Sequence, residues 1–164
     1  MKSRRREQTS GVTLKRGETT MSTTEAENKE LARKLPEEVI NEGNLDIIDE
    51  VVADDYVSRL PTFPEPIHGP DELKEAVSMF RTAFPDLEYT VEDLIAEGDK
   101  VVRRDRATGT HDGEFMGIEP TGKEVEFEGV VIFRVEDGQL VEAWSQGDMM
   151  GLMQQLGVVE PPRG

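Results

Sequence analysis

Hydrophobic residues recur at helical spacing in the first half of the chain and at every second position in much of the second half. Residues 24–42 place four apolar side chains on one face of a helix: Leu31, Leu35, Val39 and Ile40. Gly43 is positioned to end this helix. Pro36 falls inside it and removes one backbone donor, so we expect the helix to kink there.

The residues that follow predict two further helices and a short strand. Asn44 is placed to cap a short helix over residues 44–52. Residues 54–70 contain four prolines, which favours a short strand followed by a loop. Asp71 is a candidate cap for a third helix, which we expect to end at the proline after Phe84.

Beyond Phe84 the hydrophobic period changes from 3.6 to 2, which predicts strands. Four strand candidates are separated by turn signals: residues 87–97, 100–111, 123–136 and 139–146. Residues after 148 predict a short last helix. Helices followed by a long antiparallel meander indicate an α+β fold in which the helices pack on one concave face of the sheet.

Side-chain parity predicts which strand residues face the core. In the third strand candidate, five apolar residues share one face: Val125, Phe127, Val131, Phe133 and Val135. In the fourth, another four residues share a face: Leu140, Glu142, Trp144 and Gln146. Asp148 has the same parity if this strand continues, so it would lie on the side of Trp144.

Composition constrains the environment and the partners. The 164 residues suit one domain with its own core, and 35 acidic residues against 19 basic ones give a net charge of −16 at pH 7. This charge disfavours nucleic acid as a partner. Acids are spread through the domain, which suits a cytoplasm at high salt, where self-repulsion is screened. We therefore expect a cytoplasmic protein from a halophilic source.

Several kinds of site are disfavoured by residue type. Cysteine is absent, which excludes disulfides, thiolate nucleophiles and Cys-based zinc sites. His68 and His111 are the only histidines, so a His-rich metal site is not expected. The glycines of residues 113–123 lack the spacing of a phosphate-binding loop. These residue types therefore disfavour a Cys- or His-based metal site and a nucleotide-binding site.

The first twenty residues are rich in basic side chains, unlike the rest of the chain. They lack the apolar core of a signal peptide, so we interpret residues 1–22 as a disordered leader or a misassigned start, with a nucleic-acid-binding arm as the weaker alternative. No stretch approaches eighteen apolar residues, so no membrane span is expected. Residues 23–160 form the predicted single domain, followed by a tail at 161–164.

Residues 109–157 contain short motifs in a distinctive order. They are GTH at 109–111, GEFMGI at 113–118, PTGK at 120–123, the DG turn at 137–138, the VE.W...D run that ends at Asp148, and QLG at 155–157. In this order they resemble the SnoaL-like polyketide cyclase and ester cyclase family. The earlier blocks NEGNLDIIDEVVADDYV and FPDLEYTVEDLIAEGDKVV look similar too, which extends the resemblance over about residues 25–158.

The resemblance implies the cone-shaped α+β barrel of the nuclear-transport-factor-two-like superfamily, with a curved antiparallel sheet around N-terminal helices and an internal pocket. Characterised cyclases of the family close a ring by aldol condensation without cofactor or metal. They use an aspartate near the end of the last long strand as general acid/base, and Asp148 is the matching position. A homodimer is also implied. Residues 58–60 and Asp105 depart from the family pattern, and Asp105 stands where an apolar residue is expected.

Asp148 and His111 are the catalytic candidates. A carboxylate at the mouth of an apolar pocket could take a proton alpha to a carbonyl. The alternative is that Asp148 only caps the last helix, because Asp is a favoured N-cap residue. The imidazole of His111 could donate to a developing enolate oxygen, and the alternative is a histidine satisfied by backbone groups at a turn.

Trp144, Gln146 and Arg134 are candidate substrate-binding residues. Trp144 and Gln146 share the predicted face of Asp148, although core packing is the default for a lone tryptophan. Arg134 could bind an anionic or carbonyl group, but a rim ion pair is the simpler expectation. His68 is expected at the surface.

These features predict a cofactor-independent protein that binds a small apolar carbonyl compound. It would perform cyclisation or isomerisation by acid/base chemistry through Asp148 and His111. The alternative is a non-catalytic ligand-binding or dimerisation module on the same fold.

Overall fold

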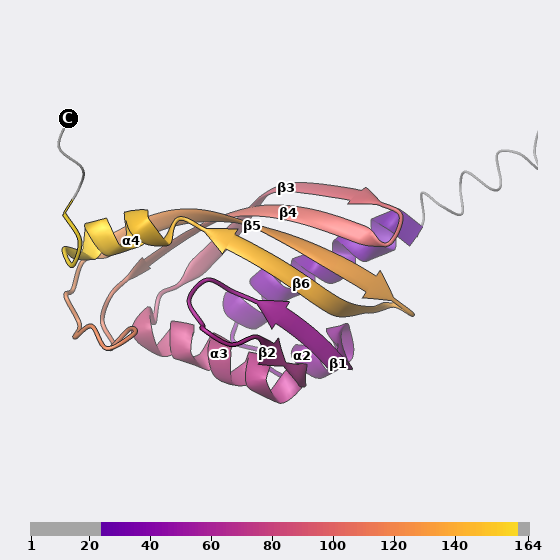
Figure 1. Cartoon of the computed structure of the whole chain (residues 1–164), viewed down its shortest axis with the longest axis horizontal. Helices are drawn as coiled ribbons and strands as arrows, with labels where there is room; N and C mark the ends of the chain where they lie inside the picture. Colours follow the sequence, from indigo (N-terminus) through magenta and orange to yellow (C-terminus); the bar gives the residue numbers. More distant parts are fainter. Residues whose placement is uncertain (1–23, 161–164) are drawn as a thin grey trace, which may run out of the picture.

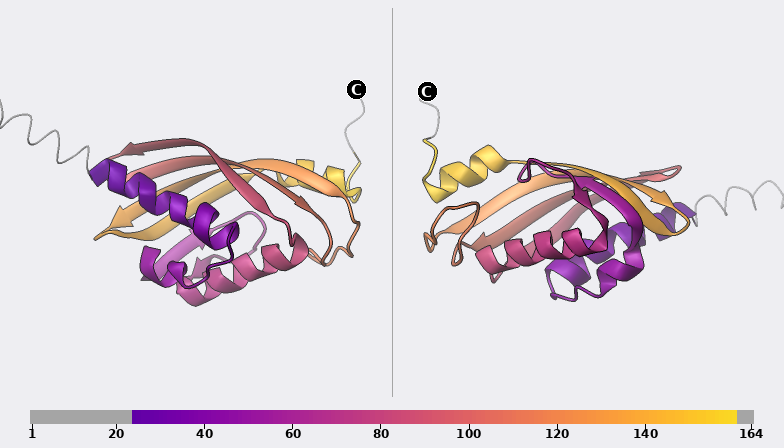
Figure 2. Two further views of the ribbon diagram at one scale, coloured as in Figure 1. Left: turned by 180° about the vertical axis from the view of Figure 1, so that it is seen from behind. Right: turned by 60° about the horizontal axis from the view of Figure 1, so that its bottom comes forward.

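The computed structural model describes residues 24–160, and its architecture confirms the predicted α+β fold. The predictions for the leader at 1–22 and the tail at 161–164 concern residues outside this range. One curved sheet forms an upper layer, and helices lie beneath its concave face (Figures 1 and 2). The sheet is open, so it forms part of a cone without closing into a barrel.

The sheet has six strands in the order β2-β1-β6-β5-β4-β3. Their bounds are β1 Val52–Arg59, β2 Ile67–His68, β3 Glu88–Glu97, β4 Lys100–Thr110, β5 Glu124–Glu136 and β6 Gln139–Gly147. β1 runs parallel to β6, whereas the other neighbours are antiparallel. The four long strands β3 to β6 agree with the predicted ranges to within about one residue at each end.

The helices cover the concave face of the sheet. Residues 24–34 are α-helical and continue directly into the π-helical segment η2. The bounds of the others are η2 Leu35–Ile40, α2 Ile47–Val51, α3 Gly69–Ala83 and α4 Met149–Leu156. Figure 2 shows the helix of residues 24–40 and α3 side by side under the sheet, with α4 at one end. The predicted end of α3 at Phe84 is confirmed, since Phe84 is its C-cap.

At Pro36, where a kink was predicted, the helix changes from α-helical to the π-helical segment η2. The helix continues through the proline, and the Asn41 N–H donates to the Pro36 carbonyl at 2.9 Å. This is an i→i−5 bond, which widens the turn by one residue. The chain therefore accommodates a proline that would clash in a regular α-helix.

The predicted caps of the next two helices are wrong. The N-cap of α2 is Asp46, not Asn44, and its side chain makes no capping hydrogen bond. α3 begins two residues before Asp71, with His68 at its N-cap. The His68 N–H donates to the Glu72 carboxylate at 2.7 Å, so a side chain from inside the helix binds the N-cap backbone at this end.

The apolar core has two parts along the concave face. The larger part packs the helix of residues 24–40 and α3 against β1 and the centre of the sheet, and includes Val39, Ile48 and Phe133. The smaller part packs the end of α3 against α4 and the far ends of β4 and β5, and includes Phe84 and Leu152. The predicted inward face of β5 is confirmed, since its odd-numbered residues are buried or half-buried and nearly all of its even-numbered ones are exposed.

The predicted inward face of β6 is wrong beyond its first residues. A β-bulge at Val141 shifts the register, because Val135 pairs with Leu140 while Arg134 pairs with Glu142. Leu140 is buried as expected, but after the bulge the buried residue is Ala143. One extra residue moves every later side chain of the strand to the opposite face.

Candidate active site

A cavity of about 160 Å³ lies between the concave face of the sheet and the helices. Most of its wall is apolar, and includes Leu35, Val39, Val77, Phe80, Phe127 and Phe133. The polar residues in the wall include Tyr56, Ser58, Tyr89, Arg103, Asp105 and Ser145. A concave, mostly apolar space with a few convergent polar groups is the usual form of a small-molecule site.

Arg103 and Asp105 form a buried ion pair in the cavity wall. They occupy alternate positions of β4, so both side chains point inward from the same strand. The Arg103 Nε–H donates to both carboxylate oxygens of Asp105, at 2.9 and 2.8 Å. The two residues are only 4% and 3% exposed.

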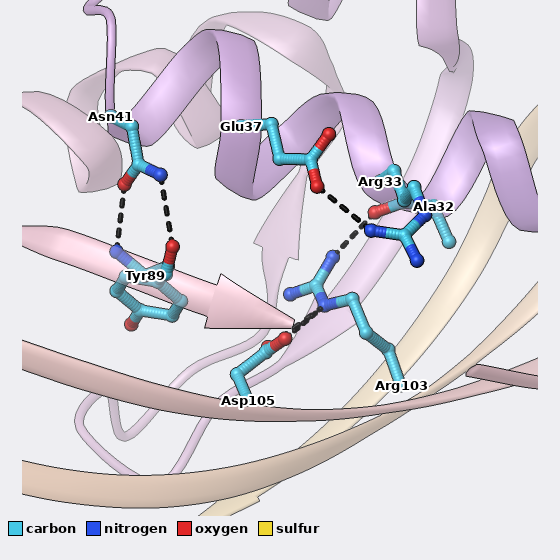
Figure 3. A network of polar contacts seen from close by, with 7 residues as sticks. All are labelled: Ala32, Arg33, Glu37, Asn41, Tyr89, Arg103 and Asp105. Atoms are coloured by element: carbon cyan, nitrogen blue, oxygen red, sulfur yellow. Dashed lines mark hydrogen bonds and ion pairs between the residues drawn. The ribbon is translucent and has the colours of Figure 1, made fainter. Parts of the chain in front are cut away.

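Two further contacts hold the Arg103 guanidinium. Its Nη1 donates to the backbone carbonyl of Ala32 at 2.7 Å (Figure 3). Its central carbon lies 5.1 Å from the ring centroid of Phe133, a cation–π distance. The guanidinium is therefore fixed by its own strand, by the helix opposite and by a ring from β5.

Burial controls the electrostatics of Asp105. Desolvation raises its pKa above the ordinary value, and the charge and hydrogen bond of Arg103 oppose this effect without cancelling it. A carboxylate in this setting is a stronger base than one in water, yet Arg103 compensates its negative charge. These are the properties of a general acid/base that works in an apolar cavity.

Tyr89 also lines this cavity. Burial raises the pKa of the Tyr89 phenol to about 12, so it stays protonated at neutral pH. Its backbone is held by the side chain of Asn41, which donates to the Tyr89 carbonyl at 2.9 Å and accepts from the Tyr89 N–H at 2.7 Å (Figure 3). Burial also raises the pKa of Tyr56, so the cavity contains two neutral phenols.

Asp148 lies between two residues that line the cavity, Gly147 and Met149, but it does not line the cavity itself. It is exposed and forms the N-cap of α4, accepting the Gly151 N–H at 2.8 Å. The structure thus gives Asp148 the capping contact of the alternative interpretation. Its catalytic role stays a prediction.

His111 is fully buried and lies outside the cavity wall. Its Nδ1 accepts the Thr121 N–H at 3.2 Å and lies 3.0 Å from the Thr121 hydroxyl, and its ring packs 5.6 Å from that of Phe84. These contacts match a histidine satisfied locally at a turn, although Nε2 has no hydrogen-bond partner among residues 24–160. No hydrogen bond joins His111 to Asp148 among the described residues.

The three predicted binding residues lie mainly on the outer face. Trp144 pairs with the exposed Ile132 and does not line the cavity, because the bulge in β6 reverses its direction. Arg134 forms the expected surface ion pair, with Glu142 at 3.0 Å, and also lies outside the cavity wall. Gln146 is exposed but does contribute to the wall.

Arg103, Asp105 and Tyr89 were not among the predicted site residues. Strand parity alone could have found the first two, since they are charged residues on a face that otherwise carries Val101, Ala107 and Gly109. Asp105 was noted only as a departure from an apolar position. No comparable signal marked Tyr89, because a single tyrosine in a strand is an ordinary core residue.

No group of three or more acidic or histidine side chains suited to a metal ion occurs within residues 24–160. In the same range, no helix is both long and apolar enough to cross a membrane. His68 is exposed, as predicted.

Comparisons with known proteins extend over the whole cavity-forming region. A family model described as SnoaL-like polyketide cyclase matches residues 30–156. The aklanonic acid methyl ester cyclase DauD of Streptomyces sp. (strain C5) is 29% identical over 139 residues, which cover 82% of this chain and 85% of DauD.

Solved structures show the same architecture. A candidate SnoaL-like polyketide cyclase from Jannaschia sp. CCS1 superposes with a TM-score of 0.76 at 29% identity, covering 84% of this chain and 95% of that one. AclR of Streptomyces galilaeus, a candidate hydroxylase, superposes with a TM-score of 0.74 at 32% identity, covering 85% and 86%.

Proposed function

Since this chain belongs to the SnoaL-like polyketide cyclase family, we propose that it is a cofactor-independent enzyme that closes a ring in a small, largely apolar carbonyl compound. The observation that carries the proposal is the Arg103–Asp105 pair, buried in the wall of an apolar cavity. An ion pair is costly to bury, so its place in the wall of an apolar cavity favours a chemical role.

In this reaction Asp105 acts as the general acid/base. Its carboxylate takes a proton from the carbon alpha to a carbonyl. The electrons of that C–H bond form a C=C bond, and the π electrons of the C=O bond move to the oxygen, which gives an enolate. The enolate carbon then bonds to a second carbonyl carbon, and the proton passes from Asp105 to the new alkoxide oxygen. Atoms and charge balance within the substrate, so no external reactant is consumed.

Arg103 and Tyr89 support this chemistry in different ways. Arg103 compensates the charge of Asp105 before proton transfer, which opposes the effect of burial on the pKa of Asp105. Tyr89 stays neutral, and its hydroxyl can donate a hydrogen bond to the developing enolate oxygen. Preorganised donors in a water-poor site contribute more than they would in bulk water.

The cavity limits the size of the reacting part of the substrate. Its volume of about 160 Å³ is close to that of an apolar cavity of roughly 150 Å³ that binds benzene. We therefore expect the reacting ring to enter and the rest of a larger substrate to remain toward the side of Gln146 and Met149.

The test compares two isosteric variants, Asp105→Asn and Asp148→Asn. Proton abstraction is followed by NMR as deuterium exchange at the α-carbon of monocyclic and bicyclic ketones in D₂O. We expect Asp105→Asn to lower the enzyme-dependent exchange rate by a factor of about 100 or more, and Asp148→Asn to change it little. The opposite result would assign the reaction to Asp148, the original candidate.

The competing function is binding without chemistry, on the same fold. One observation favours it: Arg103 already occupies both oxygens of Asp105, as in a structural ion pair. A ligand at 100 times its dissociation constant stabilises the fold by about 2.7 kcal/mol. If ketones raise the melting temperature but no α-hydrogen exchanges, binding is the function and the enzymatic proposal fails.

A further inference from the structure

Pro36 leaves one backbone carbonyl of its helix without the usual donor. In an α-helix, the N–H of each residue bonds to the carbonyl four residues earlier. The donor for the Ala32 carbonyl would thus be the N–H of residue 36, and proline has none. Ala32 is fully buried, so water cannot replace the missing donor without entering the core.

Arg103 supplies the missing hydrogen bond. Its Nη1 lies 2.7 Å from the Ala32 oxygen, while its Nε–H points at the two oxygens of Asp105. The two contacts use different nitrogens of one planar group, so together they fix both its position and its rotation. Figure 3 shows the guanidinium between the helix and the carboxylate.

We infer that Pro36 is a positioning residue: by withholding an N–H, it frees the Ala32 carbonyl to hold the Arg103 guanidinium in the orientation that pairs with Asp105. The inference rests on the proposed role of Asp105 as acid/base. Proline is unusual in the middle of a helix, and this role explains its place there. The helix opposite the sheet then contributes a backbone atom to the site.

The alternative is that Pro36 only shapes the helix. It is buried, and it introduces the widened turn that brings Asn41 against Tyr89. A purely structural role predicts that replacing Pro36 changes stability but leaves the titration of Asp105 unchanged. A positioning role predicts a change in that titration.

The experiment replaces Pro36 by Ala and follows the side-chain carboxyl ¹³C shift of Asp105 against pH in the full-length protein. Restoring the N–H gives Ala32 a helical donor that competes with Arg103. Because Arg103 lowers the pKa of Asp105, we expect the titration midpoint to rise by about one pH unit, as for a weakened charge-assisted hydrogen bond. Three other ionisable groups line the cavity, namely Tyr56, Tyr89 and Glu128, and the two phenols stay neutral over this range.

Two variants serve as controls. Pro70→Ala changes another helix proline, which lies in the first turn of α3 where no N–H is needed, and should leave the midpoint unchanged. In an Arg103→Lys background, Pro36→Ala should add no further shift, because the ammonium cannot reproduce the planar fork. An equal shift in both backgrounds would show that Pro36 does not act through Arg103.

An unchanged midpoint in folded Pro36→Ala would overturn the inference. If that variant does not fold, the unmodified protein decides the question by ¹⁵N NMR of the Arg103 guanidinium. Slowly exchanging Nη1 protons support the anchor at Ala32, and rapid rotation and exchange would refute it. Neither measurement needs a substrate, so this inference and the proposed function can fail separately.

Discussion

The burial of Asp105 makes the stability of the fold depend on pH. Burial outweighs the effect of Arg103, so the pKa of Asp105 is higher in the folded chain than in the unfolded one. The folded state therefore binds this proton more tightly. Its contribution to stability is complete below the unfolded value and is lost as the pH rises through the folded value.

We predict that the free energy of unfolding, relative to the Asp105→Asn variant, falls as the pH rises above the ordinary Asp value of 3.8. The loss levels off above the folded pKa. Urea unfolding of both proteins from pH 3.5 to 8 provides the measurement. A difference that grows in favour of the natural chain with rising pH would mean that the attraction of Arg103 exceeds the desolvation of Asp105.

The sequence alone did not identify which of the 35 acidic residues lies in the cavity wall. Asp148 was selected by its place in a motif and by strand parity, but a bulge at Val141 changes the parity before the motif ends. Asp105 was visible as a charged residue on a buried face, together with Arg103. Identifying the pair needed the distance between them, and that depends on side-chain conformation rather than on spacing.

Element boundaries were more predictable than contacts between elements. Turn signals such as Asp137-Gly138 act locally, so the long strands fall where they were expected. The bulge in β6 and the widened turn of η2 were not predicted in form, because each depends on a partner. β6 must pair with β1 and β5 together, and η2 must pack against β3, to which its C-cap Asn41 is hydrogen-bonded.

At this scale, Asn41 joins the end of η2 to the edge strand β3. We predict that Asn41→Ala lowers the free energy of unfolding by about 1–3 kcal/mol, because two partly buried backbone groups of Tyr89 lose their partners. Amide exchange at Tyr89 should accelerate more than at Val101 in the neighbouring strand.

Asn41→Asp is the matched comparison, since a carboxylate can accept from the Tyr89 N–H but cannot donate to its carbonyl. We expect it to retain part of the protection of the amide. Equal exchange in Asn41→Ala and the natural protein would show that solvent or neighbouring strands satisfy these groups instead.

The whole molecule carries a net charge of −16. On the outer face of the sheet, some of the acidic side chains form ion pairs with arginines. Arg104 contacts Asp93 and Glu128, and Arg106 contacts Glu92 and Glu126, across three strands. Exposed pairs of this kind each contribute little. The excess acids remain, and their mutual repulsion acts on the fold as a whole.

We predict that the melting temperature rises as KCl increases from about 0.05 to 2 M, because the Debye length falls to about 3 Å near 1 M and repulsion is screened. Sucrose at matched osmolality adds no ions, so it separates screening from general solute exclusion. A melting temperature that is highest in dilute buffer would contradict the predicted adaptation to high salt. Sedimentation in the same buffers tests the predicted homodimer.

The contact between Asn41 and Tyr89 also bears on aggregation. β3 is an edge strand, and free backbone groups on an edge can pair with a strand from another molecule. The Asn41 amide occupies the N–H and the carbonyl of Tyr89 in the way an added strand would. At this point the Asn41 side chain occupies the positions where another strand would pair. The residue that holds Tyr89 in the cavity wall therefore also hinders self-association through the β3 edge.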